Sequence, residues 1–184
     1  ILEAWFPNHL GGKAIAETLF GDYNPGGKLS VTFPKTIGQI ELNFPFKPGS
    51  QAGQHQEGPN GHGKTRVNGA LFPFGYGLSY TTFKYENLKV TPTSQKTKGA
   101  FKITADITNT GKRSGDEIVQ LYIRDKVSSV ITYDSQLRGF ERVNLKPGET
   151  KKVEFTLHPE DLMILDKNMN WTVEPGEFEF MLGA

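Results

Sequence analysis

In residues 71–184 the apolar and polar side chains alternate in short runs, which is the period of half-buried β-strands. Every second residue of 101–107 is apolar, and more polar neighbours separate Val119, Leu121 and Ile123. Because alternate side chains of a strand point to opposite faces, one face of each run is predicted to be buried. The same pattern predicts further strands at residues 83–90, 137–145, 153–157, 171–173 and 178–182.

Turn signals separate these runs at regular intervals. Residues 109–112, 146–149 and 174–176 each contain Gly together with Asn or Pro, and residues 158–162 predict one helical turn. Roughly seven short strands joined by such turns over about 110 residues indicate a β-sandwich.

The first 34 residues have the pattern of a piece of an α/β unit. Residues 1–5 are predicted to end a buried strand, and residues 13–20 are predicted to form a short amphipathic helix that Gly21 terminates. Leu29, Val31 and Phe33 alternate as a short strand. A segment of this length cannot form a core alone, so we expect it to pack against another domain or against chain outside this sequence.

Residues 35–70 are rich in Gly, Pro, Gln and Asn, and they predict a long loop. Within it, residues 58–65 match the phosphate-loop pattern G-x-x-x-x-G-K-T. A phosphate loop requires a buried strand before it and a helix after it, so that backbone N–H groups converge on the phosphate. Neither flank has that pattern, so the match is interpreted as chance.

Composition excludes several classes of protein. A hydrophobic fraction of 36% is enough for a core, and a net charge of +1 gives no reason to expect nucleic acid or a membrane surface as partner. The chain has no cysteine, which excludes disulfides and thiolate metal sites. No apolar run reaches the roughly 18 residues of a membrane span. Neither an initiator Met nor a signal-peptide pattern begins the sequence, so we expect it to start within a longer gene product.

The segment 71–85 carries the most specific pattern, because aromatic residues surround Pro73 and a Gly-Tyr-Gly sequence. Glycine allows close approach of backbone segments, so this pattern predicts a tight turn pinned to a core. Further motifs along the chain are Ala4–Pro7 with Gly11–Ala16, Leu19–Leu29, Thr32–Pro34, Pro73–Thr81, Asn109–Gly111, Gly115–Glu117 with Val119–Tyr122, Leu137–Val143 and Pro175–Phe178. In this order, these motifs resemble glycoside hydrolase family 3 over nearly the whole chain, and Asn8-His9 is a local departure from the family pattern.

The resemblance implies a mainly β fold with three parts. Residues 71–184 would form an immunoglobulin- or fibronectin III-like β-sandwich. A short α/β remnant, residues 1–34, would be the C-terminal end of an α/β sandwich domain, and the long loop, residues 35–70, would join the two.

The resemblance also implies a retaining, exo-acting β-glycosidase, most often a β-glucosidase that releases terminal glucose and needs no cofactor. The family places its aspartate nucleophile in an N-terminal (β/α)8 barrel. Its acid/base glutamate lies in the α/β sandwich domain, upstream of the motif at Ala4-Trp5. No catalytic, cofactor-binding or metal-binding residue is therefore assigned to this chain, and the chain alone is expected to be inactive.

The expected partners are the N-terminal barrel, the rest of the α/β sandwich domain, a β-glucoside or oligosaccharide substrate, and a second copy in a possible homodimer. Similar chains are often periplasmic or secreted in bacteria that degrade plant polysaccharides. The sandwich is expected to brace the catalytic domains, and residues 35–70 are expected to reach an active-site rim or a neighbouring subunit.

The residues themselves offer no site that competes with this interpretation. A retaining glycosidase needs two carboxylates about 5–5.5 Å apart, and none of the acidic residues is distinguished by its neighbours. Asp116-Glu117 and Glu160-Asp161 are interpreted as turn and cap residues. A transition metal needs several fixed ligands, and the histidines are interpreted as solvated loop residues. The remaining candidates are Glu3, Glu17, Asp22, Glu41 and Glu57 among the acids, His9, His55, His62 and His158, and the glycosylation sequon Asn170-Trp171-Thr172.

Two alternatives stay open: a carbohydrate-binding module and a purely structural or adhesive fibronectin-like module. The first would present an exposed, coplanar row of aromatic rings. Alternation instead predicts inward packing of four rings, Phe101, Phe155, Phe178 and Phe180. The second gives residues 1–34 no role, although they carry some of the strongest family motifs.

Overall fold

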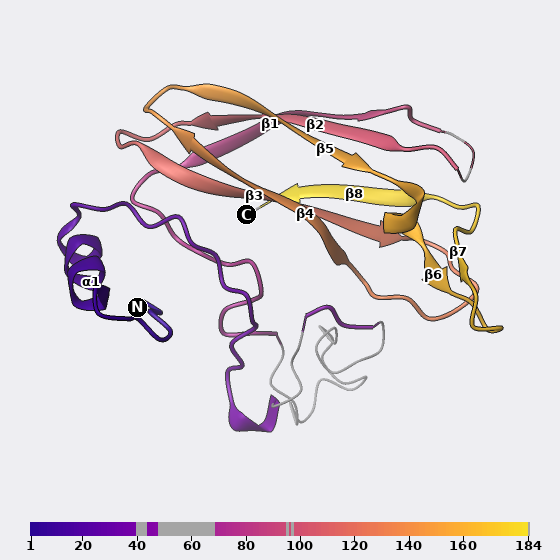
Figure 1. The fold of residues 1–184 in the computed structure, drawn as a ribbon, viewed down its shortest axis with the longest axis horizontal. Coiled ribbons are helices and arrows are strands. Elements are labelled where there is room, and N and C mark those ends of the chain that lie inside the picture. Colours follow the sequence, from indigo (N-terminus) through magenta and orange to yellow (C-terminus); the bar gives the residue numbers. More distant parts are fainter. Residues whose placement is uncertain (40–43, 48–68, 95, 97, 184) are drawn as a thin grey trace, which may run out of the picture.

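The computed structural model describes residues 1–39, 44–47, 69–94, 96 and 98–183. Within these residues the chain forms two antiparallel three-stranded sheets packed face to face, with helix α1 at one side, away from the sheets (Figure 1). The predicted mainly β architecture with a β-sandwich is therefore confirmed.

The first sheet has the order β1-β2-β5 and the second the order β4-β3-β8. In residues 71–184 each predicted strand corresponds to an observed one, with only Val173 falling outside, and residues 159–162 form the predicted helical turn as helix η3. The strands are β1 (Phe83–Thr91), β2 (Phe101–Asn109), β3 (Gly115–Asp125), β4 (Gln136–Leu145), β5 (Thr150–Leu157), β6 (Ile164–Leu165), β7 (Trp171–Thr172) and β8 (Phe178–Gly183), and the helices are α1 (Gly11–Phe20), η1 (Ile37–Gln39) and η3 (Pro159–Leu162).

The core lies between the two sheets, where the alternating apolar positions meet. From β2 and β3, Ile103, Ile107 and Leu121 are completely buried. The predicted inward rings are confirmed: Phe101, Phe155, Phe178 and Phe180 pack against the core cluster around Ile103 and Leu121. Phe101 and Phe180 lie across the sandwich from each other with ring centroids 5.4 Å apart. Strand periodicity alone thus placed the core correctly.

One buried polar residue organises the end of β2. The Asn109 side chain is fully buried, and its amide donates to the backbone oxygens of Leu145 at 2.9 Å and Arg113 at 2.7 Å. Its oxygen accepts the Thr81 hydroxyl at 2.7 Å and the Gly111 N–H at 3.0 Å. Because all of these groups find partners, burial of this amide is compatible with a stable core.

Two strand predictions for the first 34 residues are wrong. Residues 1–5 form no strand, because no described segment pairs with them, and Trp5 has φ 50. Residues 29–33 contribute only an isolated bridge between Phe33 and Phe72. Their partner segment cannot continue a ladder, because Pro73 has no N–H and Gly75 turns the chain with φ 81.

Helix α1 begins two residues before its predicted start and ends as expected, with Gly21 in the left-handed conformation at φ 86. Of its predicted apolar face, Leu19 and Phe20 are exposed by 62% and 84%. Most of the predicted loop 35–70 lies outside the described residues, and the division of the chain at residues 34 and 70 stays a prediction.

Candidate functional site

Two loop segments, residues 21–34 and 69–82, pack against β3 and the adjacent end of the sandwich, and we call these contacts the seam. Figure 1 shows both segments running along one side of the sandwich between α1 and the sheets. Asn24 is a hub of the seam, because its amide donates to the Ser114 oxygen at 3.0 Å and its oxygen accepts the Ser79 hydroxyl at 2.9 Å and the Tyr80 N–H at 2.7 Å. One side chain therefore ties together both segments and the start of β3.

A buried ion pair lies at the centre of the seam. Lys28 Nζ is 3.4 Å from Glu117 Oε2, and the two side chains are only 11% and 4% exposed. The Tyr85 hydroxyl donates to Glu117 Oε1 at 2.8 Å, and Lys28 Nζ also donates to the Gly77 oxygen at 3.4 Å. Buried charges are tolerated only when they are paired and hydrogen-bonded, and both conditions are met here.

Burial and the Glu117 charge act together on Tyr85. Burial contributes most to raising the pKa of its phenol, followed by repulsion from the Glu117 carboxylate and the hydrogen bond to it. The phenol therefore stays protonated and acts as a donor, which satisfies the carboxylate oxygen that Lys28 does not reach.

Glycines let the backbones of the seam touch. A Cβ on Gly26 would lie 2.6 Å from the backbone oxygen of Asp116, and a Cβ on Gly77 would collide with the backbone oxygen of Gly27. Such distances are not accessible to a real side chain, so these two positions require glycine. The Gly75 oxygen accepts the Gln120 amide at 3.1 Å, which fixes the turn after Pro73 to the outer face of β3. The tight turn predicted here is confirmed, but it is pinned to a sheet face rather than to the core.

Much of the apolar surface of residues 1–37 has no cover within the described chain. Phe6 and Ile1 are fully exposed, and Phe20 is 84% exposed. A soluble protein rarely leaves large apolar side chains together in water, so such a face indicates contact with another protein surface. The exposed large apolar residues of this part are Ile1, Leu2, Trp5, Phe6, Leu10, Leu19, Phe20, Tyr23, Val31 and Ile37.

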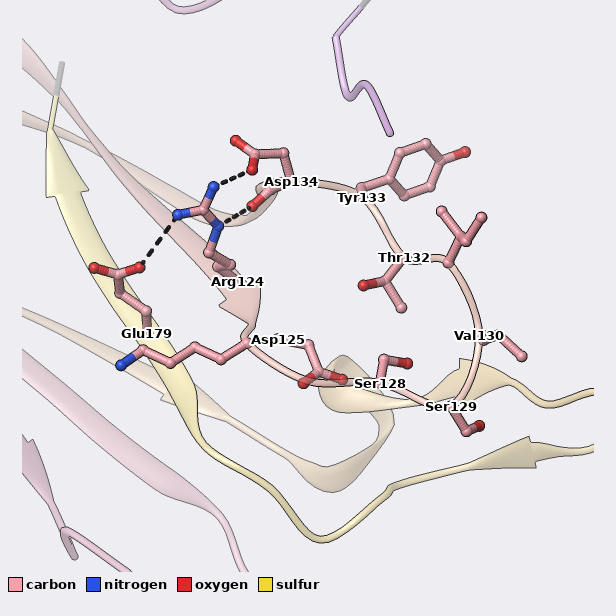
Figure 2. A pocket seen from close by; sticks show the side chains of 11 residues that line it. Arg124, Asp125, Ser128, Ser129, Val130, Thr132, Tyr133, Asp134 and Glu179 are labelled. Carbon is pink, nitrogen blue, oxygen red and sulfur yellow. Dashed lines mark hydrogen bonds and ion pairs between the residues drawn. The ribbon is translucent and has the colours of Figure 1, made fainter. Parts of the chain in front are cut away.

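The opposite end of the sandwich carries an open depression of about 790 Å³. It lies between the end of β3, the connection to β4 and Glu179 of β8 (Figure 2). Arg124 spans it, donating through Nε to the Asp134 backbone oxygen at 2.9 Å and pairing with the Asp134 and Glu179 carboxylates. Arg124 therefore braces the depression internally, and apolar side chains such as Val130 and Ile131 line it together with polar ones.

The acidic residues weighed from the sequence have different fates. Asp116 and Glu117 were interpreted as turn residues, and this was wrong: both lie within β3, and Glu117 is 3% exposed. The sequence did contain a signal for this. Glu117 lies two residues before Val119 in the series Val119, Leu121 and Ile123, so its side chain is on the same inward face of the strand, where a charge must be paired. Asp161 is confirmed as a cap residue, since its carboxylate accepts the His158 N–H at 2.8 Å.

The other candidates are not brought together into a site. Glu3 accepts the Trp5 N–H at 2.9 Å, and Glu17 forms an exposed pair with Lys13 at 3.6 Å. In the part of the chain that the structure describes, no group of three His, Asp or Glu residues could hold a metal ion. Asp22 and His9 are exposed, as is Asn170 of the sequon, whereas the phosphate-loop match, Glu41, Glu57, His55 and His62 lie outside the described residues.

Comparison with known proteins assigns a domain type to each side of the seam. Residues 1–80 match the glycosyl hydrolase family 3 C-terminal domain, and residues 117–184 match a fibronectin type III-like domain. The first match contains the exposed apolar residues, the segment 21–34 and residues 69–80 of the other segment, and the second match begins at Glu117. The seam is thus a contact between two recognised domain types.

Similar proteins match the chain over its whole length. A β-xylosidase of Formosa agariphila is 46% identical over 187 residues, which are 100% of this chain and 25% of that protein. A periplasmic β-glucosidase of Salmonella typhimurium is 40% identical over 194 residues, 100% of this chain and 24% of that protein. The chain thus spans about a quarter of the length of these relatives.

Solved structures agree with the sequence matches. A β-glucosidase from Listeria innocua, solved in complex with glucose, superposes with a TM-score of 0.87 and 31% identity over 98% of this chain and 25% of that one. These matches confirm the resemblance seen in the motifs: the chain belongs to glycoside hydrolase family 3 and corresponds to the C-terminal portion of its members.

Proposed function

We propose that this chain is the C-terminal part of a retaining, exo-acting β-glycosidase that removes terminal glucose from β-glucosides. The chain braces the catalytic domains, and the catalytic aspartate and glutamate lie in parts of the enzyme outside it. The observation that carries the bracing role is the combination of a tightly interlocked seam with an uncovered apolar face. A rigid sandwich holds one side of residues 21–34 and 69–82, while the residues before them offer apolar surface to another domain.

Electrostatics and packing both support a fixed rather than a flexible junction. A buried ion pair requires a defined geometry, because a small displacement would leave two desolvated charges without partners. The Gly26 contact allows little sliding, since its backbone lies directly against the Asp116 backbone of β3. A rigid support of this kind suits an active site built between domains, where small displacements of positioning groups reduce the rate strongly.

The glucoside specificity is proposed from relatives. The solved neighbours with high structural similarity are β-glucosidases, whereas the relatives in sequence include both β-glucosidases and β-xylosidases. The test is to express the complete protein and compare hydrolysis of an aryl β-glucoside with that of the matching aryl β-xyloside. A higher kcat/KM for the glucoside is expected, and a preference for the xyloside would refute this part of the proposal.

The isolated chain provides the complementary test of the bracing role. We expect residues 1–184 alone to hydrolyse neither substrate, and to bind a dye that reports exposed apolar surface more strongly than the complete protein does. Phe6→Ser together with Phe20→Ser should reduce this dye binding in the isolated chain and weaken its association with the separately expressed N-terminal part. Hydrolysis by the isolated chain would contradict the proposal.

We also propose that the complete protein is exported to the periplasm or secreted by a bacterium, as the Salmonella relative's name indicates for that protein. No helix in the described ranges is long and apolar enough to cross a membrane. Fractionation of the native host, with activity followed in each fraction, tests the location.

Residues 35–70 are proposed to contribute to an active-site rim or to a homodimer contact. Deleting residues 48–68 from the complete enzyme should change turnover or oligomer mass. If neither changes, this contribution is refuted while the bracing role stands.

A further inference from the structure

We propose that the depression at the end of β3 is a binding site for a neutral, polyhydroxylated ligand, that is, a short saccharide. It is lined by Arg124–Lys126, by residues 128–134 and by Glu179. Its volume of about 790 Å³ falls within the range of roughly 300–1,000 Å³ typical of small-molecule sites. The choice of saccharide probes rests on the proposed glycosidase function, but the site itself rests on the groups that line it.

The walls of the depression are held in place by hydrogen bonds within the chain. Arg124 clamps Asp134 on one side and Glu179 on the other (Figure 2). Ser129 donates its backbone N–H to Glu174 at 2.9 Å, and its hydroxyl donates to the same carboxylate. A connection without regular secondary structure is therefore fixed at both ends, which lowers the conformational entropy lost when a ligand binds.

The charges that line the depression exclude an anionic ligand. Both basic side chains are already paired, Arg124 with two carboxylates and Lys126 with Glu177 at 3.5 Å. The Asp125 carboxylate accepts a hydrogen bond from the Val127 N–H at 3.2 Å and has no cationic partner among the described residues. An anion such as phosphate would meet net negative charge here, whereas a sugar hydroxyl could donate to the free carboxylate oxygen.

The environment of Asp125 supports this role. Burial contributes most to raising the pKa of its carboxyl, and repulsion from Glu174 adds to the rise, while the Val127 hydrogen bond opposes it. The carboxylate has thus lost part of its hydration without gaining a charge partner. A hydroxyl donor would replace the lost water, and hydrogen bonds to charged groups contribute about 1.5–3 kcal/mol.

Hydroxyl groups complete the lining. The Ser128 hydroxyl is shielded from solvent and has no hydrogen-bond partner among the described residues, and Thr132 adds a second hydroxyl to the lining. An unsatisfied buried polar group costs about 1–3 kcal/mol and calls for a partner, here an ordered water or a ligand hydroxyl. In Figure 2 the Ser128 and Thr132 hydroxyls point toward the inside of the loop. Tyr133 adds a partly exposed ring at the rim, 5.7 Å from Lys47 Nζ.

The test is a titration of the isotopically labelled chain with cellobiose and xylobiose, followed by backbone amide shifts. Saturable shifts confined to residues 124–134 and 179 are expected, with a dissociation constant on the order of 1–10 mM. Asp125→Asn keeps the Val127 contact but removes the charge, and it should weaken binding about tenfold. Asp106→Asn on β2, a carboxylate on the other sheet, is the matched control and should leave binding unchanged.

Several outcomes would overturn the proposal. The proposal fails if neither sugar gives saturable amide shifts, if the shifts centre on other residues, or if the Asp106 control weakens binding as much as Asp125→Asn does. It also fails if butylamine, used as a cationic probe without hydroxyl groups, binds in preference to the sugars. If the isolated chain gives no dispersed spectrum, crystals of the complete protein are soaked in cellobiose instead. Sugar bound beside Asp125 would support the proposal, and its absence there would overturn it. Hydrolysis by the complete protein is measured separately, so failure of the saccharide site does not affect the proposed glycosidase function.

Discussion

Replacing Lys28 by Met is expected to destabilise the chain far more than its single charge suggests. The substitution leaves Glu117 buried and without a cation, with only the Tyr85 hydroxyl as partner. At 3.4 Å and an effective dielectric constant near 20, the lost attraction is about 5 kcal/mol. Removing one partner of a buried pair typically costs about 3–5 kcal/mol, and we expect a loss in that range.

The assay is equilibrium urea unfolding of the two single variants and the double variant, Lys28→Met, Glu117→Leu and both together. Each single variant should lose about 3–5 kcal/mol, whereas the double variant should lose much less than the sum, because no uncompensated charge remains. The matched control is Lys102→Met, which breaks the exposed pair with Glu154 at 2.8 Å and should cost about 0–1 kcal/mol.

A cost of Lys28→Met no larger than that of the Lys102 control, or additive effects of the two seam substitutions, would contradict a desolvated ion pair at this position. Either result would mean that water reaches the pair and screens it. The bracing role would then have to rest on the glycine contacts and the Asn24 hub alone.

Other variants test the Tyr85 phenol, the glycine contacts and the core between the sheets. The folded-state pKa of Tyr85 is raised above its ordinary value of 10.0, so the contribution of Tyr85 to stability is complete below pH 10 and is lost as the pH rises above 10. Tyr85→Phe removes this titration, and it should therefore reduce the fall in the free energy of unfolding between pH 9 and 11. Gly77→Ala, whose Cβ would strike the Gly27 oxygen, should lower the melting temperature by several degrees, whereas Gly12→Ala in α1, with nothing within 4 Å, should leave it unchanged or raise it. Leu121→Ala, at a completely buried position, should cost about 2–5 kcal/mol in urea unfolding, and a loss below about 1 kcal/mol would contradict the assigned core.

The sandwich could be predicted from the sequence because its strands are locally encoded. In residues 101–107 and 119–123 a period of two is sufficient to define an inner face, and Gly-containing turns mark the ends. The pairing of β2 with β5 and of β3 with β8 could not be predicted in this way. These pairs join residues far apart in the chain, and alternation contains no information about which strand is the neighbour.

The seam was missed because its chemistry depends on contacts between distant residues. Lys28 and Glu117 are unremarkable in their own segments, and Asp116 beside Glu117 suggested a turn. The inward-facing position of Glu117 required a partner for its charge. Only the fold identified this partner as Lys28, with the Tyr85 hydroxyl bound to the second carboxylate oxygen.

By itself, the sequence determined the secondary structure of the sandwich, the family, and the incompleteness of residues 1–34 as a folding unit. Those properties depend on local periodicity and on motifs of neighbouring residues. Tertiary structure alone decided which charge is buried, which glycines touch another backbone, and where a depression opens at the end of β3. These properties arise because burial and electrostatic pairing are set by distances between residues, and the sequence specifies such distances only after the chain has folded.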